Sequence, residues 1–342
     1  MTENNLTHYQ TQLENKTRQL KQRFADLTSI EPEVFDSPDK HFRMRAEFRI
    51  WHSDGVLNYV MFKKGEKNTP IIIDDFPNAS LTIANAMKPL LDAIQTDTIL
   101  SRKLFQIDFL STTQDELLVT LLYHKKLDES WEKSAQKLQT DLGISVIGRA
   151  RKQKIVLNKD FVVETMNVDG HTYQYQQVEN SFTQPNAVIC EKMLNWVVKH
   201  SKNNPHDLLE LYCGNGNFTL PLSKNFRQVL ATEVSKTSVK SANENIALNN
   251  IENVKIVRLS SEELTQALNK VREFRRLANI NLDDYAFETV FVDPPRAGLD
   301  AETLAFVSQF DTIIYISCNP DTLHENIAQL KTHKIENFAL FD

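Results

Sequence analysis

A cysteine near the end of the sequence is placed where it could act as a nucleophile. Cys318 lies in the string Ser-Cys-Asn-Pro (317–320), directly after TIIYIS, which has the composition of a buried strand. A thiolate attacks electrophilic carbon readily and can later leave, so a cysteine in a turn after a strand suits covalent catalysis. The alternative is a small, unreactive core residue, which is what most lone cysteines are.

A glycine turn and two acids follow other strand-like strings in the same way. Gly214 and Gly216 follow DLLELY, Glu233 ends QVLATE, and Asp293 follows ETVFV. Glycines let the backbone approach a ligand closely. An acid 17 residues beyond Gly216 can accept hydrogen bonds from both hydroxyls of a ribose. A nicotinamide dinucleotide fits less well, because the third glycine of the G-x-G-x-x-G fingerprint is missing.

Strand-like and helix-like segments alternate from about residue 181 onward. The expected strands are 207–212, 228–233, 254–258, 288–292 and 312–317, and the expected helices are 184–199, 216–224, 236–249, 261–269 and 300–309. This alternation indicates an α/β fold with a doubly wound parallel sheet. Ligands of such sheets bind outside the carboxyl ends of the strands, so Glu233, Asp293 and Cys318 should lie at one edge.

Residues 1–180 have a different pattern, which indicates an α+β domain rich in antiparallel sheet. Apolar residues from Leu6 to Leu27 recur at helical spacing, and 42–51 with 56–62 read as a hairpin. Further expected elements are strands 104–110, 117–123, 144–150 and 154–157 and helices 79–94 and 129–141. We therefore expect two domains, residues 1–180 and 181–342.

Composition limits the classes of protein to consider. No run of the 342 residues is long and apolar enough for a membrane span. Three cysteines without disulfide-like spacing indicate a reducing compartment, and we expect the cytoplasm. The net charge is −6, so nucleic-acid binding would depend on local clusters, whose alternative is an ordinary solvated strand face. The two basic clusters are Lys40, His41, Arg43, Arg45 and Arg49, and Arg149, Arg151, Lys152, Lys154 and Lys159.

Several strings together resemble one family. The C-terminal half is similar to the class I (Rossmann-like) methyltransferases, and more specifically to the RNA uracil-5-methyltransferases, through NSFTQPN (180–186), LLELYCGNGNFTL (208–220), LATE (230–233), FVDPPRAGLD (291–300) and ISCNP (316–320). The N-terminal half resembles the bacterial tRNA enzymes of the TrmA type through HFRMRAEFRIW (41–51), KLFQIDFL (103–110) and LLYHKKLD (121–128). The related ribosomal-RNA enzymes hold an iron–sulfur cluster with four cysteines. Three cysteines therefore favour the tRNA branch, whose substrate is the uridine of the T-loop.

The resemblance implies S-adenosylmethionine as the cofactor, without a metal or an iron–sulfur cluster. The implied cofactor-binding residues are Gln184, Tyr212, Gly214, Asn217, Glu233 and Asp293. Cys318 would be the nucleophile, and the implied RNA contacts are Arg45, Arg49, Phe105 and Arg296. The expected partner of this RNA-binding and methyltransferase chain is the T-arm of tRNA, with other T-loop-like RNAs as further candidates. We expect a monomer that binds no membrane.

One part of the family pattern has no counterpart in the sequence. The family's general base is a Glu in a segment beyond the sixth strand, and the chain ends at Asp342 before any such segment. Glu325 follows the nucleophile but matches no family base. We therefore expect a truncated C-terminal end and a covalent RNA adduct that forms but turns over poorly.

Two other functions remain open from the sequence. Enzymes that methylate an exocyclic amine of a nucleobase share the Asp-Pro-Pro turn, but they prefer an aromatic residue where Arg296 stands and need no cysteine. An RNA-binding or tRNA-folding factor would use the basic clusters and could coexist with methylation.

Overall fold

The computed structural model describes residues 7–63, 65–66, 69–202 and 204–342, which form two compact units. We call the first the parallel-sheet unit; it comprises the chain up to residue 37, residues 166–175 and residues 189–342. The antiparallel-sheet unit comprises residues 38–165 and 176–188. The chain thus passes between the units more than once, and residues up to 37 belong with the C-terminal half, whereas a division near residue 180 was expected from the sequence. Each unit is described by itself.

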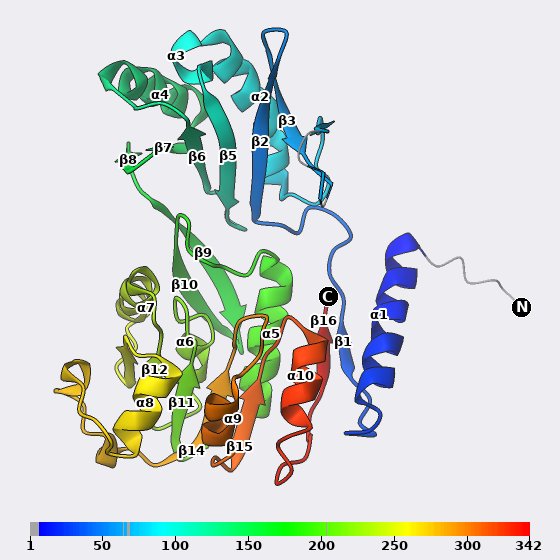
Figure 1. The fold of residues 1–342 in the computed structure, drawn as a ribbon, viewed down its shortest axis with the longest axis vertical. Helices are drawn as coiled ribbons and strands as arrows, with labels where there is room; N and C mark the ends of the chain where they lie inside the picture. The colour runs from blue at the N-terminus through cyan, green and yellow to red at the C-terminus, as the bar shows by residue number, and fades with distance from the viewer. Residues whose placement is uncertain (1–6, 64, 67–68, 203) are drawn as a thin grey trace, which may run out of the picture. The chain divides into compact units, whose positions relative to one another are not determined.

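The parallel-sheet unit is built around five parallel strands in the order β13-β12-β11-β14-β15. Figure 1 labels four of them, β12, β11, β14 and β15. The strands are β11 (Asp207–Leu211), β12 (Val229–Thr232), β13 (Val254–Val257), β14 (Phe287–Val292) and β15 (Thr312–Tyr315). The helices between and around them are α5 (Ala187–His200), α6 (Thr219–Leu222), α7 (Lys236–Leu248), α8 (Ser261–Leu268), α9 (Ala301–Val307) and α10 (Pro320–Ile327), with short 3₁₀ turns at Arg275–Leu277 and Leu282–Asp284. All five residues of β11 are buried, as expected for the central strand of a sheet covered on both faces.

The chain ends meet in this same unit. Helix α1 (His8–Phe24) begins with a capping box at Thr7, and strand β1 (Glu33–Phe35) pairs in parallel with β16 (Ala339–Phe341). The buried Phe24 ring contacts the ring of Phe338 with centroids 5.0 Å apart. The predicted N-terminal helix is confirmed from His8 onward, and its predicted first residue, Leu6, lies outside the described residues.

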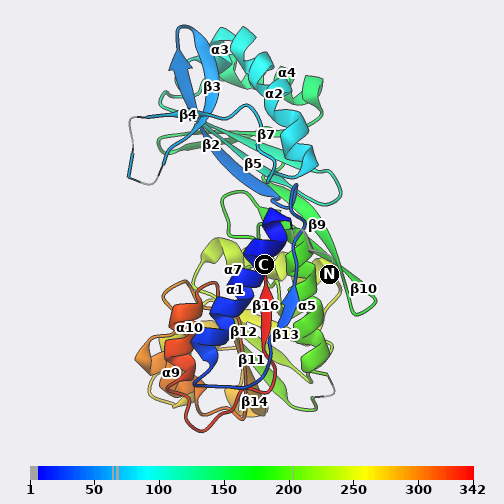
Figure 2. The ribbon, with the colours of Figure 1, turned by 90° about the vertical axis from the view of Figure 1, so that its right-hand side faces the viewer.

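The antiparallel-sheet unit holds a seven-stranded sheet in the order β4-β3-β2-β5-β6-β7-β8. Its strands are β2 (Arg45–Ser53), β3 (Val56–Met61), β4 (Ile71–Ile72), β5 (Leu104–Ser111), β6 (Leu117–Tyr123), β7 (Ser145–Ala150) and β8 (Gln153–Val156), and its helices are α2 (Leu81–Thr96), α3 (Thr98–Ser101) and α4 (Glu129–Leu142). Only β6 and β7 pair in parallel, because α4 connects them as a crossover. Helices α2 and α4 lie beside the sheet (Figure 2). Their buried residues share one core with one face of the sheet.

Residues alternate between the two faces of this sheet along β2. Ala46, Phe48 and Ile50 are buried, whereas Glu47 and Arg49 between them are exposed. Along β2 the sheet therefore has one face that packs against the helices and one exposed face that carries polar and basic side chains.

Most of the predicted strands and helices are confirmed within a few residues. One predicted helix, 216–224, is shorter, because Gly216 has a φ of 84° and cannot continue a right-handed helix; α6 covers only Thr219–Leu222. The hairpin of β9 (Phe161–Val168) and β10 (His171–Val178) was not predicted, although its Asp169-Gly170 turn has two positive φ angles, the type I′ signal. In the described part of the chain, no helix has the length and apolar character that crossing a bilayer needs.

Candidate functional site

The carboxyl ends of four parallel strands bring most of the predicted site residues to one edge of the sheet. Tyr212 follows β11, Glu233 follows β12, Asp293 follows β14, and Cys318 lies three residues beyond β15. Because all four strands run in the same direction and lie side by side, these residues share one edge, as the sequence predicted.

The glycine turn after β11 has an unusual backbone. Tyr212, Gly214 and Gly216 have φ angles of 61°, 57° and 84°. A left-handed conformation is rare for a bulky residue such as tyrosine, and such strain is found preferentially at functional sites. At Gly216 a Cβ would also lie 2.8 Å from the Leu220 side chain, which adds to the cost of any other residue at this left-handed φ. The turn therefore places two residues without side chains, Gly214 and Gly216, at the sheet edge.

Asn217 is fixed at the end of this turn by two neighbours. Its side-chain amide donates to the sulfur of the buried Cys190 at 3.3 Å, and its backbone carbonyl accepts a hydrogen bond from the Tyr175 hydroxyl at 3.0 Å. Burial raises the pKa of Tyr175 well above its ordinary value, so this hydroxyl keeps its proton and remains a donor.

Glu233 ties the glycine turn to the next helix. Its Oε2 accepts a hydrogen bond from the backbone N–H of Gly214 at 3.1 Å, and its Oε1 accepts one from Ser235 at 2.7 Å. Ser235 is the N-cap of α7. Each carboxylate oxygen can accept a further hydrogen bond, so these contacts orient the group and leave acceptor capacity for a ligand.

Two acids with raised pKa values lie at this edge, Glu210 inside the end of β11 and Asp293 directly after β14. Burial, with a contribution from Asp293, raises the pKa of Glu210 to about 8, and burial raises the pKa of Asp293 to about 7. Glu210 is 1% exposed, and its Oε2 and the nearby Thr219 hydroxyl have no hydrogen-bond partner among the described residues. Both acids therefore carry a proton over part of the neutral pH range. Perturbed carboxyls in such a place are typical of functional sites.

Cys318 is the exposed member of the three cysteines, whereas Cys190 and Cys213 are buried. Its turn is held by Ser317, whose hydroxyl donates to the Asn319 carbonyl at 3.0 Å and accepts from the Asn319 N–H at 3.1 Å. The Asn319 side chain accepts from the N–H of Asp321 and so caps α10. The thiol thus stands on a well-ordered turn and is open to a large reactant.

Of the other predicted residues, Arg296 lies at the same edge, whereas Gln184 belongs to the other unit. Arg296 is exposed in the turn after β14, and the Asn319 side-chain amide donates to its backbone carbonyl at 3.2 Å. Gln184 belongs to the antiparallel-sheet unit, on the half-buried segment before α5.

Arg49 and Phe105 meet on the antiparallel sheet. The guanidinium carbon of Arg49 lies 3.9 Å from the centre of the Phe105 ring, and His124 stacks on that ring with centroids 4.0 Å apart. Arg45, two residues before Glu47 on β2, is half-buried, and its Nη2 has no hydrogen-bond partner among the described residues. This stack of a cation and two rings is a surface on which a base could lie.

The second basic cluster is largely engaged in ion pairs. Arg149 forms two hydrogen bonds with the buried carboxylate of Glu179, at 2.6 and 2.5 Å, and Lys154 approaches Glu179 and Asp160 at 3.4 and 2.7 Å. Lys159 pairs with Glu116. Three of the five cations therefore serve the fold, and Arg151 and Lys152 are the exposed members for which no ion pair is formed with a described residue.

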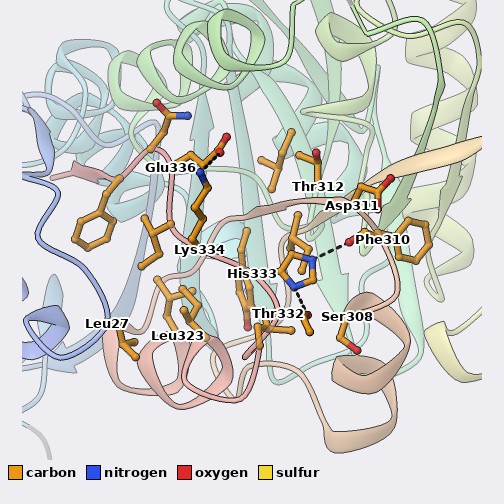
Figure 3. Close-up of a pocket in the computed structure, with 18 of the residues that line it drawn as sticks. Leu27, Ser308, Phe310, Asp311, Thr312, Leu323, Thr332, His333, Lys334 and Glu336 are labelled. Carbon is orange, nitrogen blue, oxygen red and sulfur yellow. Dashed lines mark hydrogen bonds and ion pairs between the residues drawn. The ribbon is translucent and has the colours of Figure 1, made fainter.

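A separate cavity of about 850 Å³ lies along β15 in the parallel-sheet unit (Figure 3). Segments 308–315 and 327–338 form most of its wall, and His333 is held there by the Phe310 carbonyl at 2.7 Å. None of the predicted cofactor-binding or catalytic residues lines it. Size alone therefore does not identify the functional site of this unit.

Comparisons with known proteins agree with the geometry. A sequence model of the tRNA (Uracil-5-)-methyltransferase family matches residues 8–342. The chain belongs to this family. A tRNA/tmRNA (uracil-C(5))-methyltransferase of Neisseria meningitidis serogroup B is 54% identical over 343 residues, 98% of this chain and 95% of the relative. One of Acinetobacter baylyi is 53% identical over 340 residues, 98% of this chain and 94% of the relative.

A comparison with a solved structure supports the fold assigned to this chain. The crystal structure of a Pyrococcus abyssi tRNA (uracil-54, C5)-methyltransferase in complex with S-adenosyl-L-homocysteine matches with a TM-score of 0.72. It is 22% identical, and the match covers 96% of this chain and 79% of that one. The predicted class I methyltransferase fold is therefore confirmed, as is the prediction of an S-adenosylmethionine-dependent tRNA (uracil-5-)-methyltransferase. The nicotinamide and amine-methylating alternatives are set aside.

Three residues that lie beside predicted site residues were not singled out from the sequence. Glu210 interrupts the apolar string LLELY, and an acid inside a buried strand is a signal that could have been used. Val234 follows Glu233 and is 64% exposed, which is high for an apolar residue at a ligand edge. His124 gave no local signal, since only pairing of β5 with β6 brings it to Phe105.

Proposed function

We propose that this enzyme methylates carbon 5 of the T-loop uridine of tRNA through a covalent adduct between Cys318 and carbon 6. The observation that carries the proposal is the position of Cys318. It is the exposed cysteine, and it lies on the sheet edge that also carries the glycine turn, Glu233 and Asp293. A core cysteine without reactivity would be expected inside the unit, as Cys190 and Cys213 are.

The residues of the edge fit S-adenosylmethionine. The left-handed positions Tyr212, Gly214 and Gly216 let the backbone approach a bound molecule, and Glu233 retains acceptor capacity for ribose hydroxyls. The exposed Val234 offers an apolar surface beside Glu233 for a flat ring. We assign Tyr212, Gly214, Asn217, Glu233 and Asp293 to cofactor binding, with Gln184 from the segment before α5. When bound, the cofactor supplies an electrophilic methyl group on a sulfonium.

Cys318 would make the uracil ring reactive. Carbon 5 of uracil is a poor nucleophile, so the thiolate first adds to carbon 6, and the electrons of the carbon 5–carbon 6 double bond move towards the 4-carbonyl oxygen as an enolate. Carbon 5 then takes the methyl group, and the electron pair of the broken sulfur–methyl bond stays on the cofactor's sulfur. Removal of the carbon 5 proton by a base restores the double bond and expels the thiolate.

Arg296 and Asp293 have roles that follow from their exposure and proton state. The exposed Arg296 guanidinium can donate to the enolate oxygen as negative charge develops there. The Asn319 amide, an alternative donor, already holds the Arg296 carbonyl. Asp293, with its pKa raised to about 7 by burial, changes between acid and carboxylate near neutral pH and so fits a position beside a cationic cofactor, which favours the carboxylate.

RNA binding is assigned to the open face of the antiparallel sheet. A flipped uridine leaves a gap in its stack, and the Arg49–Phe105–His124 stack can offset part of that loss, with Arg45 contributing charge. The tRNA T-arm is the proposed ligand, and other T-loop-like RNAs are further candidates. We propose that a monomer acts in the cytoplasm, a reducing compartment that suits three free thiols.

The decisive experiment traps the adduct. Unmodified tRNA containing 5-fluorouracil is incubated with the chain and S-adenosylmethionine. After methyl transfer carbon 5 carries fluorine in place of a proton, so no base can release the thiol, and a protein–RNA band should persist in a denaturing gel. Cys318→Ala should abolish the band while tRNA binding remains, and the matched variants Cys190→Ala and Cys213→Ala should still give it. A band that survives Cys318→Ala would refute the assignment of the nucleophile.

A further inference from the structure

We propose that Asn326 is a positioning residue for methyl transfer, because its side chain fixes the turn that follows Asp293 against the segment that carries Cys318. The inference rests on the proposed role of Cys318 as the nucleophile. It concerns two turns of the parallel-sheet unit, residues 293–299 and 317–319, and the helix α10 that follows the second one.

Asn326 joins three segments with one side chain. It is 7% exposed on α10. Its Oδ1 accepts hydrogen bonds from the Leu299 N–H and from the Tyr315 hydroxyl, both at 2.8 Å, and its Nδ2 donates to the Leu299 carbonyl at 3.1 Å. Leu299 ends the turn that begins at Asp293, and Tyr315 is the last residue of β15. The side chain thus pairs with Leu299 as a neighbouring strand would, while it also holds β15.

Two further contacts bring the same two turns together. The Asn319 side-chain amide donates to the Arg296 carbonyl at 3.2 Å, and the Thr322 hydroxyl lies 3.3 Å from the same oxygen. Gly298 allows this close approach, because a Cβ there would lie 2.7 Å from Asn326 Oδ1 and 3.1 Å from Thr322 Cβ. The side chains of Asn319, Thr322 and Asn326 therefore all hydrogen-bond to the backbone of the turn 293–299.

The arrangement matters because Cys318 is exposed, so the backbone of its turn sets the position of the thiol. Methyl transfer needs the thiol at carbon 6 and the methyl donor at carbon 5 of one ring, so the turns of Cys318 and Asp293 must keep a constant spacing. A misplacement of about 1 Å can slow a reaction about 100-fold. Asn326 is buried and hydrogen-bonds to the backbone of Leu299 and to the Tyr315 hydroxyl, so its effect would pass through the backbone.

The variant Asn326→Ala removes all three hydrogen bonds. We expect the single-turnover rate of adduct formation with 5-fluorouracil tRNA to fall about 10- to 100-fold at saturating S-adenosylmethionine. The dissociation constants for the cofactor and for tRNA should change less than about threefold, since the glycine turn, Glu233 and the antiparallel sheet are not altered. Asn253→Ala is the matched control. Asn253 lies at the amino end of β13, and its side-chain amide donates to the Ser223 and Phe226 carbonyls. Its replacement should therefore lower stability without slowing adduct formation.

A second variant separates positioning from stability. In Asn326→Asp, the protonated carboxyl can donate to the Leu299 carbonyl as the amide does, whereas the ionised carboxylate would face that carbonyl with an acceptor. The rate relative to wild type at the same pH should therefore recover as the pH falls. A rate for Asn326→Ala equal to wild type, or a rate ratio for Asn326→Asp that does not change with pH, overturns the inference. A wild-type chain that traps no RNA overturns the proposed function, and this inference with it.

Discussion

Replacement of Arg149 by methionine tests whether the second basic cluster serves the fold or the RNA. Arg149 lies on β7 and binds both oxygens of Glu179, which is 7% exposed. Glu179 raises the pKa of Arg149 further, so the guanidinium stays charged at every accessible pH. Methionine keeps much of the side-chain volume and removes only the charge and the two hydrogen bonds.

The expected magnitude follows from the burial of the acid. Breaking a buried pair by removing one partner costs roughly 3–5 kcal/mol, because the remaining charge is left without compensation. Lys154 stays 3.4 Å from the Glu179 carboxylate and is itself partly solvated, so we expect the lower end, about 3 kcal/mol. For a domain of 150 to 250 residues this corresponds to a melting temperature lower by roughly 10 °C.

Urea unfolding of the antiparallel-sheet unit and tRNA binding at several salt concentrations are the assays. Arg149→Met should lower the unfolding midpoint and leave the salt dependence of tRNA binding unchanged. The double variant Arg149→Met with Glu179→Gln should recover most of the stability, since no buried charge remains. Arg49→Met is the matched comparison on the same sheet, because Arg49 is exposed over a ring and pairs with no acid among the described residues.

The opposite pattern would refute the reasoning. If Arg149→Met keeps the unfolding midpoint of wild type and binds tRNA more weakly with a shallower salt dependence, Arg149 contacts phosphate and not Glu179. Arg49→Met should itself show that pattern, with the logarithmic salt slope smaller by about 0.7 to 0.9 for each phosphate that the arginine neutralised.

Three further variants test acids and a turn. Glu210→Gln should flatten the pH dependence of stability. The folded chain keeps the Glu210 proton up to about pH 8, whereas the unfolded chain loses it near pH 4.5, so the wild type loses about 1.4 kcal/mol of stability per pH unit between these values. If urea unfolding shows the same change in stability from pH 5 to pH 8 for both proteins, this reasoning is wrong. Asp108→Asn should stabilise the antiparallel-sheet unit at pH 8 by at most about 3 kcal/mol and have no such effect below pH 4, because burial raises the pKa of Asp108 to about 6. A stabilisation that is the same at every pH in thermal unfolding would argue against this expectation. Gly298→Ala should lower the free energy of unfolding by about 1–2 kcal/mol, because position 298 has a left-handed φ of 77°. It should also slow adduct formation, because the added Cβ would contact Asn326. Adduct formation at the wild-type rate would show that the turn tolerates displacement.

The site at the sheet edge could be predicted because each motif is local. A strand, a turn and a helix follow one another within a few residues, and parallel strands must end at the same edge. The turns after β11, β12, β14 and β15 therefore reveal which side chains will meet without any knowledge of packing. The Asp54-Gly55 hairpin was predictable for the same reason, since both residues have the positive φ of a type I′ turn.

Long-range pairing was not predictable from local patterns. Strand β1 is three residues long and pairs with β16 more than 300 positions away, so no short window of sequence contains both partners. The same holds for His124 beside Phe105. It also holds for Arg149, whose basic string allowed either a phosphate contact or a solvated strand face, whereas in the structure it binds Glu179.

The sequence by itself determined which residues could do the chemistry, since a nucleophile, a glycine turn and two acids at strand ends are written in short strings. Only the tertiary structure decided their state. Burial gives Glu210 and Asp293 their raised pKa values, a carboxylate on a distant segment occupies Arg149, and one buried amide at Asn326 holds two turns together. Charge state and spacing depend on everything that surrounds a group in space, and the chain acquires those surroundings only when it folds.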